Sequence, residues 1–499
     1  MCGGRPSYTS CFQPAIGAYA GFHLEQMKRQ KKRQNGGAVD MTAEHNIISF
    51  KKSAKENLFQ PVDALPLGIF RFLFGFLLCI EFLFLSRGTF PYYYIEPVFH
   101  FTYPLFDLLG FKPLPKQFLW WIFNALQIST VGIMLGLLTR ICFIVFTSAF
   151  GYFFFMESAP YTNHYYLILL LSFLMCFGHS GSIFSLDSLI NKNSRREQVG
   201  YWELFLLRFQ ICVVFFFAGL AKLNADWLIH AAPLYLNLVK HFSFLGYPLQ
   251  EKWMAVVLSW GGMLSDLGLG ILLFINRWHK LTFIWLCLFN GMNIFLFGLG
   301  IQTFPYLMLS SYILFLPGPI IRESVARFLN GKFLKYEKVS NEGTPITGSP
   351  WILGFVIIYT SLQILIPLRH LLYKRDLQWT HEGSNFSWRM MADHHETNVS
   401  ITIEDPRTKG VYIVDPQKLL NDKQLMMATN PYMLFQYVQF LKQLTREHMD
   451  IKNPIIRADI EVSVNGKPFQ HMFDPTCNLS EVSYSAFKDL RWVLPLKKT

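Results

Sequence analysis

Long runs of apolar residues recur along the chain between Leu65 and Leu368, and short polar segments separate them. A helix needs about 20 predominantly apolar residues to cross the hydrocarbon core of a bilayer, and a soluble core does not need so many such runs. The pattern predicts a polytopic α-helical membrane protein with about nine transmembrane helices. We place these helices roughly at residues 65–85, 118–138, 141–157, 165–178, 203–221, 253–275, 281–299, 302–317 and 351–368.

After Leu368, an alternation of apolar and polar residues replaces the long apolar runs. This alternation is typical of strands that bury one face. The dipeptide Asn465-Gly466 favours a tight hairpin turn, and a helix is expected at about 431–447. We expect three domains: a disordered cytoplasmic tail at 1–60, a transmembrane helical domain at 61–370, and an extramembrane α+β domain at 371–499 with strands at 399–403, 411–414 and 460–464.

Charged residues are scarce and unevenly placed. Only 16% of the 499 residues are charged and 52% are hydrophobic, whereas roughly a quarter of an average soluble protein is charged. The net charge of +12 would suit nucleic acid in a soluble protein, but here Lys and Arg gather in loops between apolar runs. The positive-inside rule puts the basic tail and the loops after predicted helices four, six and eight in the cytoplasm. The C-terminal domain is then on the outer side, in a periplasm or a lumen, and no nucleic-acid partner is expected.

The N-terminal tail lacks the compact apolar segment of a signal peptide and carries a basic run at 28–33. Met41 is an alternative start of the chain. The eight cysteines are scattered, with no CxxC pair and no metal-ligand spacing. We therefore expect neither a disulfide framework nor a metal site.

Three polar clusters fall on the predicted outer side: residues 162–164, residues 222–227 and residues 379–391. They come from distant parts of the sequence, so a site between the helices and the outer domain could form where they meet. Each cluster also has an ordinary explanation. Lys222 can be a snorkelling anchor, His164 can be a helix-start residue, and an aromatic belt can account for Trp379, Phe386 and Trp388.

Asp266 lies inside a predicted transmembrane helix, where a carboxylate is costly unless it is paired. Arg71 and Arg208 also lie in apolar runs and are the partners that the sequence offers. The sequence contains no Gly-rich phosphate loop, no Gly-x-Ser-x-Gly motif and no His-Glu-x-x-His motif. Phosphoryl transfer, serine hydrolysis and zinc chemistry therefore lack support.

Several segments resemble the vitamin K-dependent γ-glutamyl carboxylase family, whose transmembrane part is similar to the HTTM domain. The matching segments follow one another in order over roughly residues 66–490, which is more specific than any single motif. They are Phe70 to Gly75, Leu135-Gly136-Leu137 before Arg140, Asn163-His164, Leu207 to Gln210, Phe217 to Trp227, Met292-Asn293, Ser387-Trp388 before Met390-Met391, and Phe473-Asp474-Pro475.

This resemblance implies an enzyme that deprotonates vitamin K hydroquinone, whose anion reacts with O2 to give a strongly basic oxygenated intermediate. The intermediate removes a γ-proton from a protein glutamate, the carbanion adds CO2, and vitamin K 2,3-epoxide leaves. The implied partners are a lipid-soluble quinone, a glutamate-containing protein or peptide, and the membrane itself.

The resemblance also implies roles for individual residues. Lys222 is the amine base, and Asn163 and His164 position or stabilise the oxygenated intermediate. Met390 and Met391 line the quinone site, and four further substrate-binding residues are Asp226, Asn293, Trp388 and Arg389. A lysine is a base only when it is uncharged, and burial at a membrane boundary disfavours its protonated form. We therefore expect Lys222 to be a buried, uncharged amine in a site that excludes water.

The chain departs from the animal enzymes at Asn290 and Asp393, where those enzymes typically carry histidine, and it looks more like the shorter bacterial-type members. Hydroquinone oxygenation is therefore better supported than carboxylation of a conventional protein. An alternative from another class is a non-enzymatic quinone-binding or partner-binding membrane protein that keeps the fold. A transporter is a weaker third alternative, because the sequence has no visible inverted repeat and no pair of helices broken by Gly or Pro.

Overall fold

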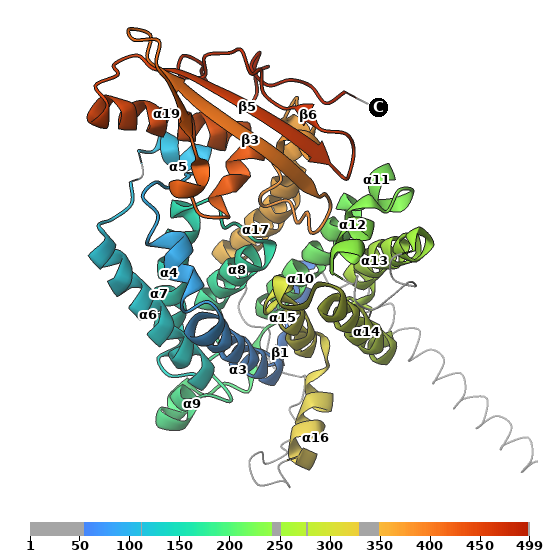
Figure 1. The fold of residues 1–499 in the computed structure, drawn as a ribbon. Helices are drawn as coiled ribbons and strands as arrows, with labels where there is room; N and C mark the ends of the chain where they lie inside the picture. The colour runs from blue at the N-terminus through green and yellow to red at the C-terminus, as the bar shows by residue number, and fades with distance from the viewer. Residues whose placement is uncertain (1–53, 111, 242–250, 276–277, 329–348, 498–499) are drawn as a thin grey trace, which may run out of the picture.

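The computed structural model describes residues 54–110, 112–241, 251–275, 278–328 and 349–497. A bundle of long helices forms one part of the molecule, and a four-stranded sheet with its own helix lies across one end of the bundle (Figure 1). The basic run at 28–33 and Met41 lie outside the described residues. Residues 54–60, which the sequence placed in the tail, include the short helix α2 (Ala54–Leu58).

Each predicted transmembrane segment corresponds to a helix in the structure. They are α3 (Leu65–Cys79) continued by the π-helical η1 (Ile80–Leu85), α6 (Lys116–Leu135), α7 (Thr139–Met156), α8 (Asn163–Phe177), α10 (Tyr201–Ala221), α13 (Lys252–Leu272), α14 (His279–Phe297), α15 (Phe304–Ser311) continued by η6 (Tyr312–Phe315), and α17 (Pro350–Leu368).

Not all of these helices are long enough to cross a bilayer by themselves. Among the described residues, seven helices are long and apolar enough, and there are eight if the bent pair of α15–η6 and α16 (Gly318–Phe328) is one span. The prediction of a polytopic helical membrane protein is confirmed. The count of nine is approximate, because α8 is short and the α15–α16 pair bends by 108°.

Shorter elements connect these helices: α4 (Thr89–Tyr94), α5 (Pro104–Leu108), α9 (Leu186–Ile190), η2 (Lys192–Ser194), α11 (Ala225–Leu228), α12 (Ala232–His241), η5 (Gly298–Ile301), η7 (Arg369–Leu372) and α18 (Leu377–Thr380). A small sheet that the sequence did not predict pairs β1 (Pro61–Asp63) with β2 (Gln198–Gly200). Arg322 of α16 binds Asp63 at 2.9 Å and Glu197 at 2.7 Å. Through these ion pairs, Arg322 connects α16 to the small sheet just before the start of α3.

Small residues allow close helix crossings in the bundle. A Cβ atom on Gly75 of α3 would lie 2.5 Å from the Cα atom of Met134 on α6, so a larger residue cannot fit there. Beside this crossing, the buried guanidinium of Arg71 donates to the carbonyls of Ile133 and Met134 at 2.6 and 2.8 Å. Carbonyls in the last turn of a helix lack their usual intrahelical partners, so Arg71 helps to satisfy the end of α6.

The C-terminal part is the α+β domain that the alternating pattern predicted. Its antiparallel sheet has the order β4–β3–β5–β6, formed by β4 (Val411–Val414), β3 (His395–Glu404), β5 (Ile455–Val464) and β6 (Gln470–His471). Helix α19 (Pro431–His448) supplies much of its apolar core, together with η9 (Gln424–Thr429) and with Leu420, which follows η8 (Pro416–Lys418). Asn465 and Gly466 both have positive φ, at 55° and 74°, which the predicted hairpin turn requires.

Polar contacts fasten this domain to the end of the bundle. The buried carboxylate of Glu157, just after α7, accepts a hydrogen bond of 3.0 Å from the Gln424 side chain. The hydroxyl of Tyr432 on α19 donates to Asp107 of α5 at 3.0 Å, and these two helices lie side by side in Figure 1. The domain is therefore held by the bundle at several points besides its covalent link through α17.

Candidate functional site

Lys222 ends helix α10 and forms a buried ion pair with Asp266 of α13. The distance from its Nζ atom to Asp266 Oδ2 is 2.6 Å, and the two side chains are only 9% and 3% exposed. The same Nζ atom lies 5.3 Å from the centre of the Trp227 ring, in cation–π range. The expected burial of this amine is therefore found, but a carboxylate accompanies the amine.

The sequence named the wrong partners for Asp266. Arg71 instead donates to backbone carbonyls at the end of α6, and Arg208 donates to the Leu314 carbonyl at 2.7 Å. An apolar run indicates how deep a residue lies in the membrane but not which way its helix is rotated. Rotation decided the pairing here.

The pair forms because helices α10 and α13 touch through glycine. A Cβ atom on Gly219 would lie 2.7 Å from Leu267 Cγ, and a Cβ atom on Gly270 would lie 3.1 Å from the backbone nitrogen of Phe216. Glycine at both positions lets the backbones approach closely. Lys222 and Asp266, each near one of these crossings, are thereby brought within reach of each other.

A cavity of about 100 Å³ adjoins the ion pair, and Lys222, Asp266, Asn293, Met390 and Met391 all line it. The other lining side chains are mostly large and apolar, among them Phe215, Trp227, Phe289, Phe297, Ile301 and Phe304. The structure thus brings together four of the predicted site residues, from α10, from α14 and from the loop before β3, together with Asp266. We call this cavity the Lys222 chamber. It is mostly apolar, and the Lys222–Asp266 pair is the acid–base pair in its wall.

Asn163 and Arg389 line a different, neighbouring cavity of about 510 Å³. The Asn163 amide donates to the Arg389 carbonyl at 2.8 Å, and its carbonyl oxygen accepts from the Tyr161 hydroxyl at 3.1 Å. Tyr161 in turn accepts from the backbone nitrogen of Phe386 at 2.7 Å. Asn163 and Tyr161 therefore hold the loop that carries Met390 and Met391 against the start of α8.

His164, Trp388 and Asp226 line neither of these two cavities. His164 is buried, and its Nε2 atom has no hydrogen-bond partner. Trp388 is fully buried and stacks on Tyr166 with ring centres 4.8 Å apart, so it is a packing residue and not part of an exposed aromatic belt. Its loop is strained, because Phe386, Trp388 and Met391 all have positive φ.

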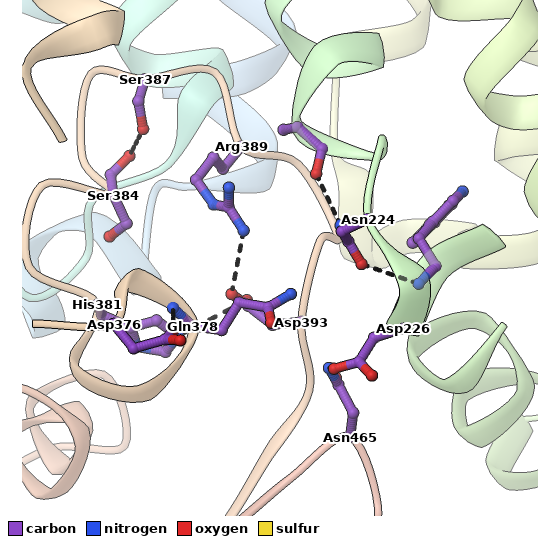
Figure 2. A network of polar contacts seen from close by, with 12 residues as sticks. Asn224, Asp226, Asp376, Gln378, His381, Ser384, Ser387, Arg389, Asp393 and Asn465 are labelled. Carbon is purple, nitrogen blue, oxygen red and sulfur yellow. Dashed lines mark hydrogen bonds and ion pairs between the residues drawn. The ribbon is translucent and has the colours of Figure 1, made fainter. Parts of the chain in front are cut away.

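Asp226 instead holds the C-terminal domain. Its Oδ2 atom accepts from the Asn465 amide and from Lys467 Nζ, both at 2.9 Å, and Figure 2 shows Asp226 pointing to Asn465. Burial alone raises the pKa of Asp226, but Lys467 and Asn465 lower it overall. Asp226 is therefore an ionised clamp between α11 and the turn after β5.

Two polar groups were missed by the sequence analysis. Glu81 is fully buried in the π-helical turn η1 and accepts from the hydroxyls of Ser86, Tyr165 and Thr303 at 2.7, 3.1 and 2.8 Å. An acid inside an apolar run and a π-helical turn both often mark functional positions, so the acid was a signal available in the sequence.

The second missed group lies in the larger cavity, where His381, Asp393 and His395 gather. Figure 2 shows His381 and Asp393 of this group beside Arg389. Burial, followed by the charge of His381, lowers the pKa of His395 to about 4. Burial raises the pKa of Asp393, but contact with His381 and the positive charges around it lower that pKa overall. At neutral pH this cluster contains a neutral imidazole next to a carboxylate.

The fold and the site define a class: a multi-pass membrane protein with a buried lysine–carboxylate pair in an apolar chamber beneath an extramembrane α+β domain. The family model for the HTTM domain matches residues 59–318, and the model for the vitamin K-dependent gamma-carboxylase, lumenal domain, matches residues 348–499. The chain therefore belongs to the vitamin K-dependent gamma-carboxylase family of HTTM-domain proteins, as its sequence predicted. No solved structure matches the chain.

Proposed function

We propose that this protein oxygenates vitamin K hydroquinone to the 2,3-epoxide and couples that reaction to γ-carboxylation of glutamate in a protein or peptide. The observation that carries the proposal is the position of Lys222, a buried amine that lines an apolar chamber and has Asp266 2.6 Å away. The chemistry supplied by the bound hydroquinone and O2 is the formation of a base strong enough to remove a γ-proton from glutamate.

The contribution of Lys222 is to take the proton from a hydroquinone hydroxyl. Accepting that proton creates an ammonium ion, which Asp266 at 2.6 Å and the Trp227 ring at 5.3 Å both stabilise. The pair therefore favours proton transfer toward the amine. For this step Lys222 has to be uncharged, so the ion pair with Asp266 has to give up its proton before the hydroquinone reacts.

The chamber also keeps water away from the reaction. Its lining is mostly aromatic and aliphatic, and the polar groups within it are few: the ion pair and Asn293. A strong base formed there meets little competing water, so it can survive until it reaches a glutamate side chain. Asn293 can orient a polar group of a bound ring through hydrogen bonds.

The chamber fits a quinone in chemistry but not in its present size. Its volume of about 100 Å³ is below the roughly 300–1,000 Å³ of ordinary ligand pockets. Met390 and Met391 form part of its wall, and Met391 is 44% exposed. Methionine side chains are flexible and repack easily. We propose that these two side chains move aside when the ring enters.

The test uses purified protein supplied with reduced vitamin K, labelled bicarbonate and a glutamate peptide, with epoxide and fixed label followed separately. We expect Lys222→Ala to abolish both products while the protein stays folded. Lys116→Ala is the matched control, because Lys116 is exposed at the start of helix α6 and its amine donates to the Glu96 carbonyl, far in sequence from the Lys222 site. Full activity in Lys222→Ala would refute the base assignment.

The same assay distinguishes the alternative class. Hydroquinone binding with no oxygen uptake would favour a non-enzymatic quinone-binding protein. Epoxide without fixed label would mean that the oxygenation half of the proposal holds and the carboxylation half fails.

A further inference from the structure

His381, Asp393 and His395 form a cluster that the sequence did not predict and that lies outside the Lys222 chamber. Each offers one ligand atom, and these atoms all lie within 4.8 Å of one another. His381 follows helix α18 in a left-handed conformation, with φ of 53°, and His395 begins strand β3. The cluster lies in the wall of the 510 Å³ cavity.

Neighbouring groups fix which ring nitrogen of His381 carries its proton. Its Nδ1 atom is 3.2 Å from the hydroxyl oxygen of Thr429. That hydroxyl already donates its hydrogen to the Met426 carbonyl at 3.1 Å, so it can only accept from His381. In a neutral His381 ring, the form that binds a metal, the proton is therefore on Nδ1 and the Nε2 lone pair faces Asp393 Oδ1, 3.6 Å away.

The second histidine is fixed in the same way. The Nε2 atom of His395 is 2.7 Å from the backbone carbonyl of Gln378, and a carbonyl can only accept, so Nε2 carries the proton. The lone pair of the neutral ring is then on Nδ1. Metal-binding histidines typically donate their other ring N–H to a carbonyl or to a similar acceptor, and this outer contact orients the ring. Both histidines here have such an outer contact.

Arg389 is the one cation beside the cluster among the described residues, and its position is compatible with a bound metal. Its Nη2 atom lies 3.8 Å from Asp393 Oδ2, whereas the other carboxylate oxygen, Oδ1, faces His381 (Figure 2). Arg389 can therefore hold one oxygen of the carboxylate while the other binds the metal.

We propose that His381, Asp393 and His395 bind one divalent first-row transition-metal cation of the zinc or iron type. Two imidazoles and one carboxylate are the ligands that these ions accept, and three protein ligands leave further coordination positions free. The cavity that Asn163 and Arg389 also line is next to those positions. This proposal does not depend on the proposed oxygenation of hydroquinone.

The metal would fasten a loop that shapes the Lys222 chamber. His381 and Asp393 bracket the segment 382–392, which includes Met390 and Met391 and the strained residues Phe386 and Trp388. Cross-linking the two ends of this segment restricts its conformations, because a metal that binds only the folded arrangement stabilises it. The site is thus a staple for the wall of the chamber.

The experiment uses the full chain in detergent, stripped with a chelator and then titrated with Zn²⁺ alone, with bound metal counted by mass spectrometry. We expect the wild type to bind one equivalent more than Asp393→Asn or His381→Ala, and Zn²⁺ to raise its Tm. His394→Ala is the matched control, because His394 is adjacent but faces Glu396, 3.6 Å away. It should bind Zn²⁺ like the wild type.

Two further measurements cover a variant that fails to fold. Thr429→Val removes the outer contact of His381, together with the hydrogen bond from the Thr429 hydroxyl to the Met426 carbonyl, and should weaken Zn²⁺ binding by about 10- to 100-fold. Co²⁺ bound to the wild type should show the absorption bands of a site with nitrogen and oxygen ligands. Equal metal content in wild type and Asp393→Asn, or no Zn²⁺-dependent rise in the wild-type Tm, would overturn the proposal.

Discussion

The buried Lys222–Asp266 pair makes a quantitative prediction about stability. The two charged atoms are 2.6 Å apart and both side chains are almost completely buried. Removing one partner of such a pair costs about 3–5 kcal/mol, because the charge that remains is buried without its counter-charge. We expect Lys222→Met and Asp266→Asn each to lower the free energy of unfolding by about this amount.

The double variant separates this effect from ordinary packing losses. With both charges removed, neither group is left unpaired, so the double variant should be more stable than the sum of the single losses predicts, by about 2–3 kcal/mol. Unfolding in mixed micelles, followed by circular dichroism, measures all three variants, with Lys116→Met as the surface control. Additive losses would show that the two side chains do not interact and would refute the geometry of the site.

Two further predictions concern the C-terminal domain. Asp226→Ala should leave the buried Asn465 amide without its acceptor, which should lower the free energy of unfolding by about 1–3 kcal/mol. Proteolytic cleavage of the β5–β6 hairpin should then be faster. An unchanged cleavage rate would contradict the role of Asp226 in holding the hairpin. In a variant without native cysteines, an impermeant maleimide applied to intact cells should label Lys418→Cys in the outer domain but not Asn193→Cys in the loop after α9. The opposite labelling would contradict the topology that the basic loops predict.

Much of the fold could be predicted from the sequence because two simple periodicities run through it. Apolar runs gave every long helix of the bundle, and alternation gave strands β3, β4 and β5 and the turn at Asn465-Gly466. The small β1–β2 sheet could not be predicted in this way. Each of its strands is only three residues long, and pairing between segments far apart in the chain forms it. In the sequence, Arg322, which contacts this sheet, was interpreted only as one of the basic loop residues that indicate the cytoplasmic side of the membrane.

The site was predicted in parts. Lys222, Asn293, Met390 and Met391 were each named from matching segments, and the structure places all four around one chamber. Their matching segments lie on separate helices and a loop, so nothing in the sequence could give the chamber volume or the contact with Asp266. Asn163 was named as a catalytic neighbour, but its visible contact is with the backbone of the 386–391 loop. A role in positioning the wall of the chamber follows more directly from that contact than a role at the reacting atoms.

The histidine–aspartate cluster shows why spacing rules failed for this chain. Asp393 and His395 are two residues apart, and alternate residues of an extended segment point to the same face. The proximity of Asp393 and His395 could therefore have been predicted at the start of β3. His381 comes close to them only because the strained segment 382–392 folds back on itself. Asp393, one of the two residues at which the chain departs from the animal enzymes, thereby supplies the single carboxylate of the cluster. A substitution that weakened the case for conventional carboxylation is, in this structure, the one that makes a metal staple beside the chamber chemically reasonable.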